Sequence, residues 1–248
     1  MSADIAVPEH DRETRFYQRI LGTGENPLWQ EDLLNSRGIP IIGLGERTDA
    51  YADLPLCWMP HIMVADVASS ASRALELGGD ELLHGRDANG VSQWAALSDP
   101  SGAAFGIIPV VPSESLPPFD EEAPPTGVIA WLDLTIPDAP AVRDFYREVV
   151  GWQVEDVAMK DGDEAYADFN MLGGDGKPAA GVCHARGVNA GLRPTWMLYL
   201  PVGDLEESLR RVRQEGGAVL KEVRGSSGEC TCAFIEDPLG IAIGLVPG

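Results

Sequence analysis

Two residues in predicted strands of this sequence have side chains suited to acid–base chemistry. His61 lies two residues after Met59 in one strand-like run, and Asp133 lies two residues after Trp131 in another. A histidine can act as a general base, and a carboxylate such as Asp4 could orient it. A desolvated Asp133 could abstract a proton or orient a ligand. The simpler alternative for His61 is an ordinary strand histidine at a surface or cleft rim, and for Asp133 it is a solvated carboxylate on an open sheet face.

The cysteines do not indicate a metal site. They lie at positions 57, 183, 230 and 232, which is the spacing of neither a zinc site nor a disulfide framework. Cys230 and Cys232 would share one face of a strand, so that a metal or redox pair there is the alternative to free thiols. Free, partly buried thiols are far more common, and we expect a reduced protein.

The overall composition is that of an acidic globular protein. The 248 residues include 44% hydrophobic residues and carry a formal net charge of −21 at pH 7. This charge repels phosphate backbones and anionic lipids, so we expect neither nucleic-acid nor membrane partners. No apolar run is long enough to span a bilayer, and the first residues show no signal peptide. We therefore expect a cytoplasmic protein.

The elements that would position these residues are duplicated. Residues 58–110 align with residues 196–248 without a gap, and identical residues recur at corresponding positions. They include the pairs Trp58/Trp196, Met59/Met197, Asp66/Asp204, Arg73/Arg211, Gly78-Gly79/Gly216-Gly217, Asp99-Pro100/Asp237-Pro238, Gly102/Gly240 and Gly106/Gly244. This alignment indicates a tandem duplication in which each half of the chain is a folding module.

The first parts of the two halves align less closely. Phe16-Tyr17 corresponds to Phe145-Tyr146, but module one is nine residues shorter between Tyr17 and Gly38. Six prolines between residues 109 and 126 indicate an extended linker. We therefore predict module one at 1–110, shortened after its first helix, a Pro-rich linker at 111–126, and module two at 127–248.

Each module contains two motifs made of a strand, a helix and further strands. Alternating apolar residues and turn residues predict strands at 58–64, 92–98, 103–108, 130–136, 152–157, 164–171, 179–184, 196–202, 230–236 and 241–246. Helices are expected after the capping residues Asp66, Asp138 and Asp204, and each ends at a glycine. The sequence thus predicts an α+β fold of tandem βαβββ modules, with mixed sheets curled around a cleft and helices outside.

Three features resemble the vicinal oxygen chelate superfamily. They are the run Asp-Phe-Tyr-Arg-Glu-Val-Val-Gly-Trp at 144–152, the repeated strand–Asp–helix–Gly-Gly unit, and the Asp-Pro-x-Gly hairpin that ends each copy. This superfamily includes glyoxalase I, bleomycin-resistance proteins, fosfomycin-resistance enzymes and extradiol dioxygenases. The resemblance covers both modules and implies the glyoxalase/bleomycin resistance-like fold. Its motifs are turn, cap and packing signals, so they say little about chemistry.

The resemblance also implies where a metal would be bound. Metal-dependent members take ligands from the first strand, from the strand before the second helix, and from the last strand. The corresponding residues here are Ser2 and Trp131, Met59 and Met197, and Gly106 and Gly244. Apart from serine, none offers an oxygen or imidazole donor suited to a divalent ion. We therefore expect no metal and no cofactor.

The residues at these positions indicate a different ligand chemistry. If Trp131 faces the cleft, strand alternation places Asp133 and Thr135 on the same face. Glycine makes room, and aromatic or thioether side chains stack on flat, polarizable ligands. The predicted ligand-binding residues are Trp131, Tyr199, Met197, Met59, Asp4, Thr135, Gly244 and Gly106, with Asp133 and His61 as candidate catalytic residues. Met59, Met197 and Trp131 could instead be core or module-interface residues.

The sequence therefore predicts a metal-independent member of this superfamily that binds an aromatic or hydrophobic small molecule. Its role would be drug sequestration, self-resistance or an accessory function in natural-product tailoring. The alternative is a metal-free enzyme that catalyses proton transfer, as in an isomerase, cyclase or hydratase. A metal-dependent glyoxalase-type lyase or dioxygenase is a weaker alternative. The sequence is compatible with a monomer or a homodimer, because the modules could pair within one chain or across two.

Overall fold

The computed structural model describes residues 1–22, 32–34, 40–112 and 126–248. The predicted Pro-rich linker at 111–126 lies largely outside these residues. The same is true of the stretch between Tyr17 and Gly38, where module one is predicted to be shorter.

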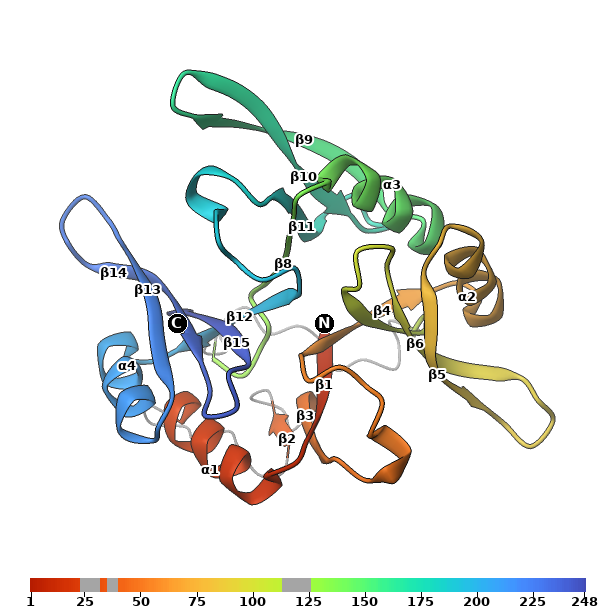
Figure 1. The fold of residues 1–248 in the computed structure, drawn as a ribbon, viewed down its shortest axis with the longest axis horizontal. Helices are drawn as coiled ribbons and strands as arrows, with labels where there is room; N and C mark the ends of the chain where they lie inside the picture. The colour runs from red at the N-terminus through yellow and green to blue at the C-terminus, as the bar shows by residue number, and fades with distance from the viewer. Residues whose placement is uncertain (23–31, 35–39, 113–125) are drawn as a thin grey trace. The chain divides into compact units, whose positions relative to one another are not determined.

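The described chain contains four copies of one strand–helix–strand motif (Figure 1). The first copy has β1 (Ser2–Val7), α1 (His10–Leu21), β2 (Asp32–Leu34) and β3 (Pro40–Glu46). The second has β4 (Met59–Val64), α2 (Val67–Glu76), β5 (Asp80–Arg86), β6 (Ser92–Ser98) and β7 (Ala104–Pro109). The third has β8 (Trp131–Ile136), α3 (Ala139–Val150), β9 (Gln153–Asp161), β10 (Glu164–Leu172) and β11 (Pro178–His184). The fourth has β12 (Trp196–Val202), α4 (Leu205–Gln214), β13 (Ala218–Arg224), β14 (Cys230–Glu236) and β15 (Ala242–Pro247).

These motifs confirm the predicted α+β fold built from βαβββ modules. Sequence reasoning missed β5 and β13, whose residues are mostly exposed or half-buried. Each of these strands is the last one in its sheet, paired only with β6 or β14 along one edge. Without a buried face, such a strand lacks the regular alternation of apolar and polar residues that the other strands display.

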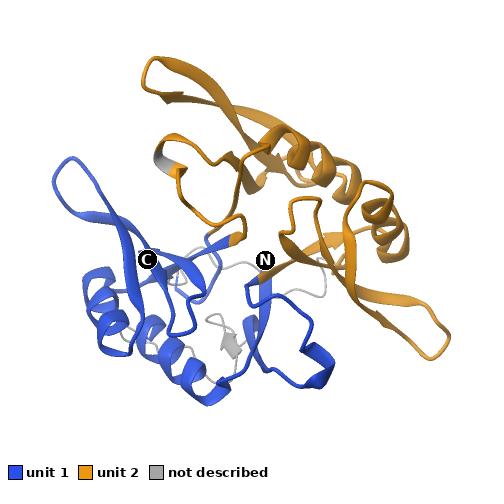
Figure 2. Cartoon of the chain, viewed as in Figure 1, with its two compact units in different colours: residues 1–58, 114–130, 197–248 blue, residues 59–113, 131–196 orange. Residues whose placement is uncertain are grey.

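The chain divides into two compact units, each of which combines parts of both sequence halves (Figure 2). Unit 1 contains residues 1–58, 114–130 and 197–248, and unit 2 contains residues 59–113 and 131–196. The first and fourth motifs therefore belong to unit 1, and the second and third to unit 2. The predicted modules 1–110 and 127–248 describe the sequence repeat, and as domain boundaries they stay a prediction.

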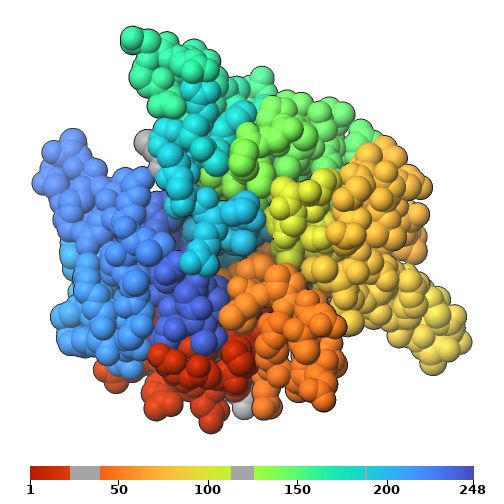
Figure 3. Space-filling view, in the orientation of Figure 1, coloured from red at the N-terminus to blue at the C-terminus, as the bar shows by residue number. Residues whose placement is uncertain are grey.

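Within each motif the first strand runs parallel to the last. β1 pairs with β3, β4 with β7, β8 with β11 and β12 with β15, all in parallel. The remaining pairs are antiparallel hairpins, in the orders β4-β7-β6-β5 and β8-β11-β10-β9 in unit 2, and β13-β14-β15-β12 in unit 1. The β5–β6 and β9–β10 hairpins project from the body of unit 2 (Figures 1 and 3).

One face of each sheet packs against a helix. In β8, Leu132, Leu134 and Ile136 are buried, and they alternate with Trp131 and Asp133, which are half-buried. The apolar stripe of α3, which includes Phe145 and Val149, is buried as well, and α3 packs against β8, β10 and β11. The predicted alternation is therefore confirmed, and Trp131 and Asp133 lie on the sheet face that points away from the helix.

The repeated tryptophans and turn aspartates form matched hydrogen-bonded chains in the core. In unit 2, Trp196 Nε1 donates to Tyr146 Oη at 3.0 Å, and Tyr146 Oη donates to Asp99 Oδ2 at 3.2 Å. In unit 1, Trp58 Nε1 donates to Tyr17 Oη at 3.3 Å, and Tyr17 Oη donates to Asp237 Oδ2 at 2.9 Å. Each chain links a helix to the turn of another motif. The repeated aspartates are therefore structural groups.

The repeated Gly-Gly pairs end the second helix of each half. They also allow a neighbouring backbone carbonyl group and a phenylalanine ring to approach the chain closely. Gly78 and Gly216 have φ angles of 87° and 90°, which favour glycine. A Cβ atom at Gly217 would lie 2.6 Å from the carbonyl oxygen of Glu236 and 2.9 Å from a ring carbon of Phe16. Gly79 is similarly enclosed by Ser98 and Phe145.

We expect Gly217→Ala to lower the free energy of unfolding by about 1–3 kcal/mol, because the backbone oxygen beside it cannot yield as a flexible side chain would. Gly174→Ala is the matched control, since a Cβ atom there meets nothing within 4 Å. Urea denaturation of both variants measures the difference. Equal stabilities would contradict the close approach at Gly217.

None of the helices in the described ranges is both long enough and apolar enough to cross a membrane.

Candidate functional site

Each motif pairs one residue of its first strand with a glycine of its last strand. The parallel register places Asp4 beside Gly43, His61 beside Gly106, Asp133 beside Gly181, and Tyr199 beside Gly244. Sequence reasoning selected six of these residues and missed Gly43 and Gly181. The missed pair was detectable, because Gly43 aligns with Gly181 once the shorter first motif is taken into account.

Three of these glycines make room for the side chain next to them. A Cβ atom at Gly106 would lie 2.9 Å from His61 Cδ2, and one at Gly244 would lie 2.6 Å from Tyr199 Cδ1. A Cβ atom at Gly181 would collide with Asp133 Oδ1. Each side chain therefore lies across the neighbouring strand, on the sheet face away from the helix, and any larger residue at these glycines would displace it.

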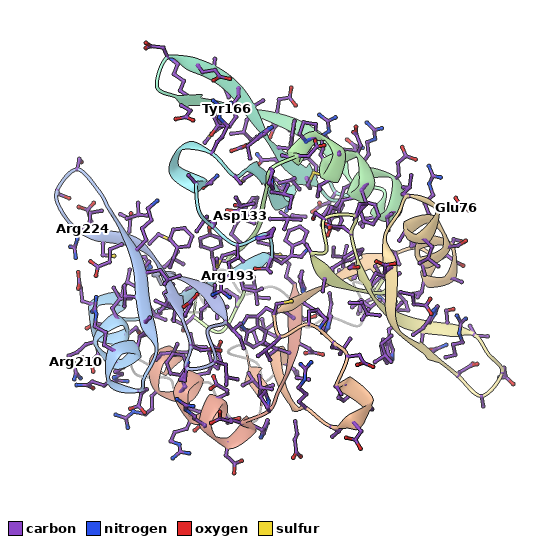
Figure 4. The ribbon with its side chains drawn as sticks, viewed as in Figure 1. Glu76, Asp133, Tyr166, Arg193, Arg210 and Arg224 are labelled. Carbon is purple, nitrogen blue, oxygen red and sulfur yellow. The ribbon has the colours of Figure 1, made fainter. Side chains whose placement is uncertain are left out.

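Trp131 and Asp133 form a hydrogen-bonded pair above Gly181. Trp131 Nε1 donates to Asp133 Oδ1 at 2.6 Å, and the Cys183 thiol donates to the same oxygen at 3.9 Å. Asp133 is labelled on β8 in Figure 4. Burial, together with the charges of Asp133 and Asp168, raises the pKa of Cys183 well above its usual range. Cys183 is therefore a protonated hydrogen-bond donor at neutral pH and is a poor nucleophile.

Aromatic side chains surround the corresponding glycine in unit 1. The ring of Tyr199 makes an edge-to-face contact with Phe234, with centroids 6.0 Å apart and planes at 77°. Gly244 pairs with both residues, one on each side, so that the two rings flank it. Met197, two residues before Tyr199, is buried.

The other predicted site residues differ in exposure. Asp4 is exposed and His61 is half-buried. Met59 and Thr135 are buried. Because Asp4 lies in unit 1 and His61 in unit 2, the orientation of His61 by Asp4 stays a prediction.

The predicted site residues therefore fall into separate groups. Unit 2 brings Trp131, Asp133 and Thr135 together on β8, and holds Met59 and His61 on β4 with Gly106 on β7. Unit 1 holds Asp4, and separately Met197, Tyr199 and Gly244. A single site that combines these groups stays a prediction.

The fold agrees with comparisons to known proteins. The family model described as a glyoxalase-like domain matches residues 130–246. The whole chain also resembles the solved structure of 2,2',3-trihydroxybiphenyl 1,2-dioxygenase from Sphingomonas wittichii. This likeness has a TM-score of 0.55, 15% identity, and covers 99% of this chain and 88% of the other. The predicted resemblance to the vicinal oxygen chelate superfamily is thus confirmed for the fold, and the second half of the chain matches a glyoxalase-like domain.

Two curated relatives are more similar to this chain in sequence than the dioxygenase is. The anthracycline biosynthesis protein DnrV of Streptomyces peucetius is 28% identical over 169 residues, which cover 68% of this chain and 58% of the relative. The putative glyoxylase CFP32 of Mycobacterium bovis is 29% identical over 120 residues, which cover 48% of this chain and 45% of that relative. The chain thus spans about half the length of the curated relatives it matches.

The residues at the superfamily's metal positions do not fit a divalent ion. Trp131, Met197 and Gly244 in the second half, and Met59 and Gly106 in the first, supply no carboxylate or imidazole. Across the described ranges, no three His, Cys, Asp or Glu side chains gather closely enough to hold a metal. The donor set therefore disagrees with the metal that the superfamily implies, and metal independence stays a prediction that metal analysis tests.

Proposed function

We propose that this protein binds a flat aromatic or hydrophobic small molecule without a metal, as an accessory to natural-product tailoring or in self-resistance. The observation that carries the proposal is the Trp131–Asp133 pair above Gly181. An indole ring that is already held by a hydrogen bond loses little conformational freedom when a ligand stacks on it. Stacking on such a ring adds to the binding free energy that is gained by burying apolar surface.

The aromatic rings around Gly244 support the same ligand chemistry. Tyr199 and Phe234 already contact each other edge to face, and they lie on the sheet face away from α4. An extended ring system is the kind of ligand that such side chains accommodate. The name of the Streptomyces relative, an anthracycline biosynthesis protein, supports a role in natural-product formation.

The proposal is tested by tryptophan fluorescence titration with aromatic polyketides and quinones. We expect at least one compound to quench the wild-type protein, and Trp131→Ala to weaken its binding by about tenfold or more, because one stacked ring contributes on the order of 1 kcal/mol beyond its buried area. The affinity should be unchanged by a chelator.

Trp94→Ala is the control variant. Trp94 lies over Gly85 on the projecting β5–β6 hairpin and is 39% exposed, so its loss removes an indole without touching β8. Equal affinities of wild type and Trp131→Ala, or binding that a chelator abolishes, would count against the proposal.

Proton transfer is the second candidate function, and the geometry of Asp133 favours it. Hydrogen bonds from the indole and the thiol orient this carboxylate above Gly181. An oriented carboxylate can act as a general base in an isomerase, cyclase or hydratase. Chromatography of a bound compound after incubation separates the two functions. Conversion that is lost in Asp133→Asn or in His61→Ala would favour the enzyme, and unchanged compound would favour binding.

A further inference from the structure

Unit 2 contains a second group of polar side chains, beside the Trp131–Asp133 pair. Tyr166 and Asp168 on β10 and His184 at the end of β11 form this group, which we call the Asp168 cluster (Figure 4 labels Tyr166). Asp168 Oδ1 accepts hydrogen bonds from the backbone N–H of His184 at 2.7 Å and from His184 Nδ1 at 3.0 Å. Asp168 is only 4% exposed. The Asp168 carboxylate is therefore buried and held in one orientation.

Two buried polar atoms of this cluster have no hydrogen-bond partner within the described part of the chain. They are Asp168 Oδ2 and the hydroxyl oxygen of Tyr166. Buried polar atoms are nearly always paired, because an unpaired one loses its hydration without compensation. Burial and the nearby charge of Asp168 raise the pKa of Tyr166, so its hydroxyl keeps its proton and can donate. The cluster thus presents one unpaired acceptor and one unpaired donor.

The segment after β11 covers the cluster. The guanidinium of Arg186 stacks on the ring of Tyr166 at 4.5 Å, and it forms ion pairs with Asp161 at 3.3 Å and Glu164 at 2.8 Å. A Cβ atom at Gly187 would lie 3.6 Å from the Tyr166 hydroxyl. The side chains of all three ion-paired residues are 30% or more exposed. Water screens such exposed pairs, so they resist the opening of this segment only weakly.

We propose that the Asp168 cluster is the binding site for a hydroxyl group of the small molecule. One hydroxyl group can donate a hydrogen bond to Asp168 Oδ2 and accept a hydrogen bond from the Tyr166 hydroxyl. Both unpaired atoms are then satisfied at once. The negative charges of Asp168 and Asp133 disfavour an anionic group in the same place. This inference rests on the proposed function and names the polar group that the aromatic ligand must carry.

The strand register limits the size of the ligand. Gly181 pairs with Asp133 on β8 and with Asn170 on β10, and Asp168 lies two residues from Asn170 on the same sheet face. Two residues of a strand span about 7 Å and neighbouring strands lie about 5 Å apart, so Asp168 lies on the order of 8 Å from Gly181, which is close to the length of two or three fused rings. A ring system that stacks on Trp131 therefore reaches the Asp168 cluster with a hydroxyl at its far end. The predicted ligand class is a phenol with two or three fused aromatic rings.

The test compares phenols with their methyl ethers, which keep the rings and remove only the donated proton. Tryptophan fluorescence titrations use 2-naphthol against 2-methoxynaphthalene and 2-hydroxyanthraquinone against 2-methoxyanthraquinone. We expect the wild-type protein to bind the phenols about tenfold tighter or more, because a site built for a hydroxyl rejects the analogue that lacks it. In Tyr166→Phe and Asp168→Asn, this preference should fall to about threefold or less, with the affinity for the ethers unchanged.

Control variants and a stability measurement separate this role from a structural one. Tyr51→Phe and Asp156→Asn make the same chemical changes at exposed positions and should keep the preference for phenols. Tyr166→Phe should not lower the thermal midpoint, because it removes a hydroxyl that has no partner in the described structure.

Three outcomes overturn the inference. Equal binding of phenols and ethers by the wild type leaves the proposed function standing and removes this site. Equal loss of both ligands in Tyr166→Phe and Asp168→Asn shows that the cluster only supports the fold. The absence of binding by any of the four compounds removes both the inference and the proposed function.

Discussion

Asp99→Ala is expected to lower the free energy of unfolding by about 3–5 kcal/mol, since each buried group left unpaired costs on the order of 1–3 kcal/mol. Asp99 is 2% exposed and accepts hydrogen bonds from Tyr146 Oη at 3.2 Å and from the backbone N–H groups of Ser101 and Ala103 at 2.8 Å and 3.1 Å. Alanine leaves these three donors without their acceptor. Urea denaturation followed by circular dichroism measures the change.

Two variants show whether this loss comes from the buried network. Asp99→Asn should be milder, because its amide oxygen still accepts from the two backbone groups. Asp66→Ala is the comparison at the surface. Asp66 also accepts a hydrogen bond from the backbone, since it caps α2 by accepting from Ser69 N at 2.7 Å, but its side chain is exposed. Asp66→Ala should cost clearly less than Asp99→Ala, since water replaces the lost acceptor. If the two alanine variants were equally stable, the hydrogen-bonded chain Trp196–Tyr146–Asp99 would contribute little to the stability of unit 2.

Glu13→Gln is expected to stabilise the protein above neutral pH. Glu13 lies on α1 with no exposed surface, and neither carboxylate oxygen has a hydrogen-bond partner in the described ranges. Burial, and then the charge of Asp237, raises the pKa of Glu13 to about 8. The equivalent position on α3 holds the apolar residue Val142. Among the described residues, Glu13 is therefore a buried acid without an ion-pair partner of its own.

The sign of the pH effect follows from this raised pKa. Between the ordinary pKa of a glutamate and about 8, the folded state holds a proton that the unfolded state has lost. Stability therefore falls as pH rises through this window, by up to about 1.4 kcal/mol per pH unit for one group. Glu13→Gln and Glu13→Val should remove most of this slope and be more stable than the wild type at pH 8.5, by roughly 3 kcal/mol.

Urea denaturation at pH 5.5, 7.0 and 8.5 measures this slope. Glu76→Gln, at a position with 62% side-chain exposure, is the matched control and should follow the wild type at each pH. A wild-type stability that stays constant from pH 5.5 to 8.5 would contradict a protonated Glu13 at neutral pH.

Most of the fold was predictable because its signals are local. Asp66, Asp138 and Asp204 each accept a hydrogen bond from the backbone three residues later, as helix caps do. Gly151 has a φ of 83°, which only glycine adopts easily, and it ends α3 as predicted. These preferences act over a few residues and do not depend on the rest of the chain.

The candidate site was predictable in part, because strand alternation shows which side chains share a sheet face but does not show which of them make contact. Alternation placed Trp131 with Asp133, yet it gave no reason for their hydrogen bond or for Gly181 beneath them. The Asp168 cluster was missed, since His184 was the end of one predicted strand and Asp168 lay inside another. Their contact depends on the antiparallel pairing of β10 with β11, which a sequence pattern does not give.

The repeat, the βαβββ motifs and the lack of carboxylate or imidazole groups at the superfamily's ligand positions follow from residue type and spacing along the chain. The hydrogen bonds of Tyr17 to Asp237 and of Tyr146 to Asp99, through which each compact unit combines motifs from both halves, follow from the folded arrangement alone. Such contacts join residues far apart in sequence, and their free energy depends on burial, which exists only once the chain has folded.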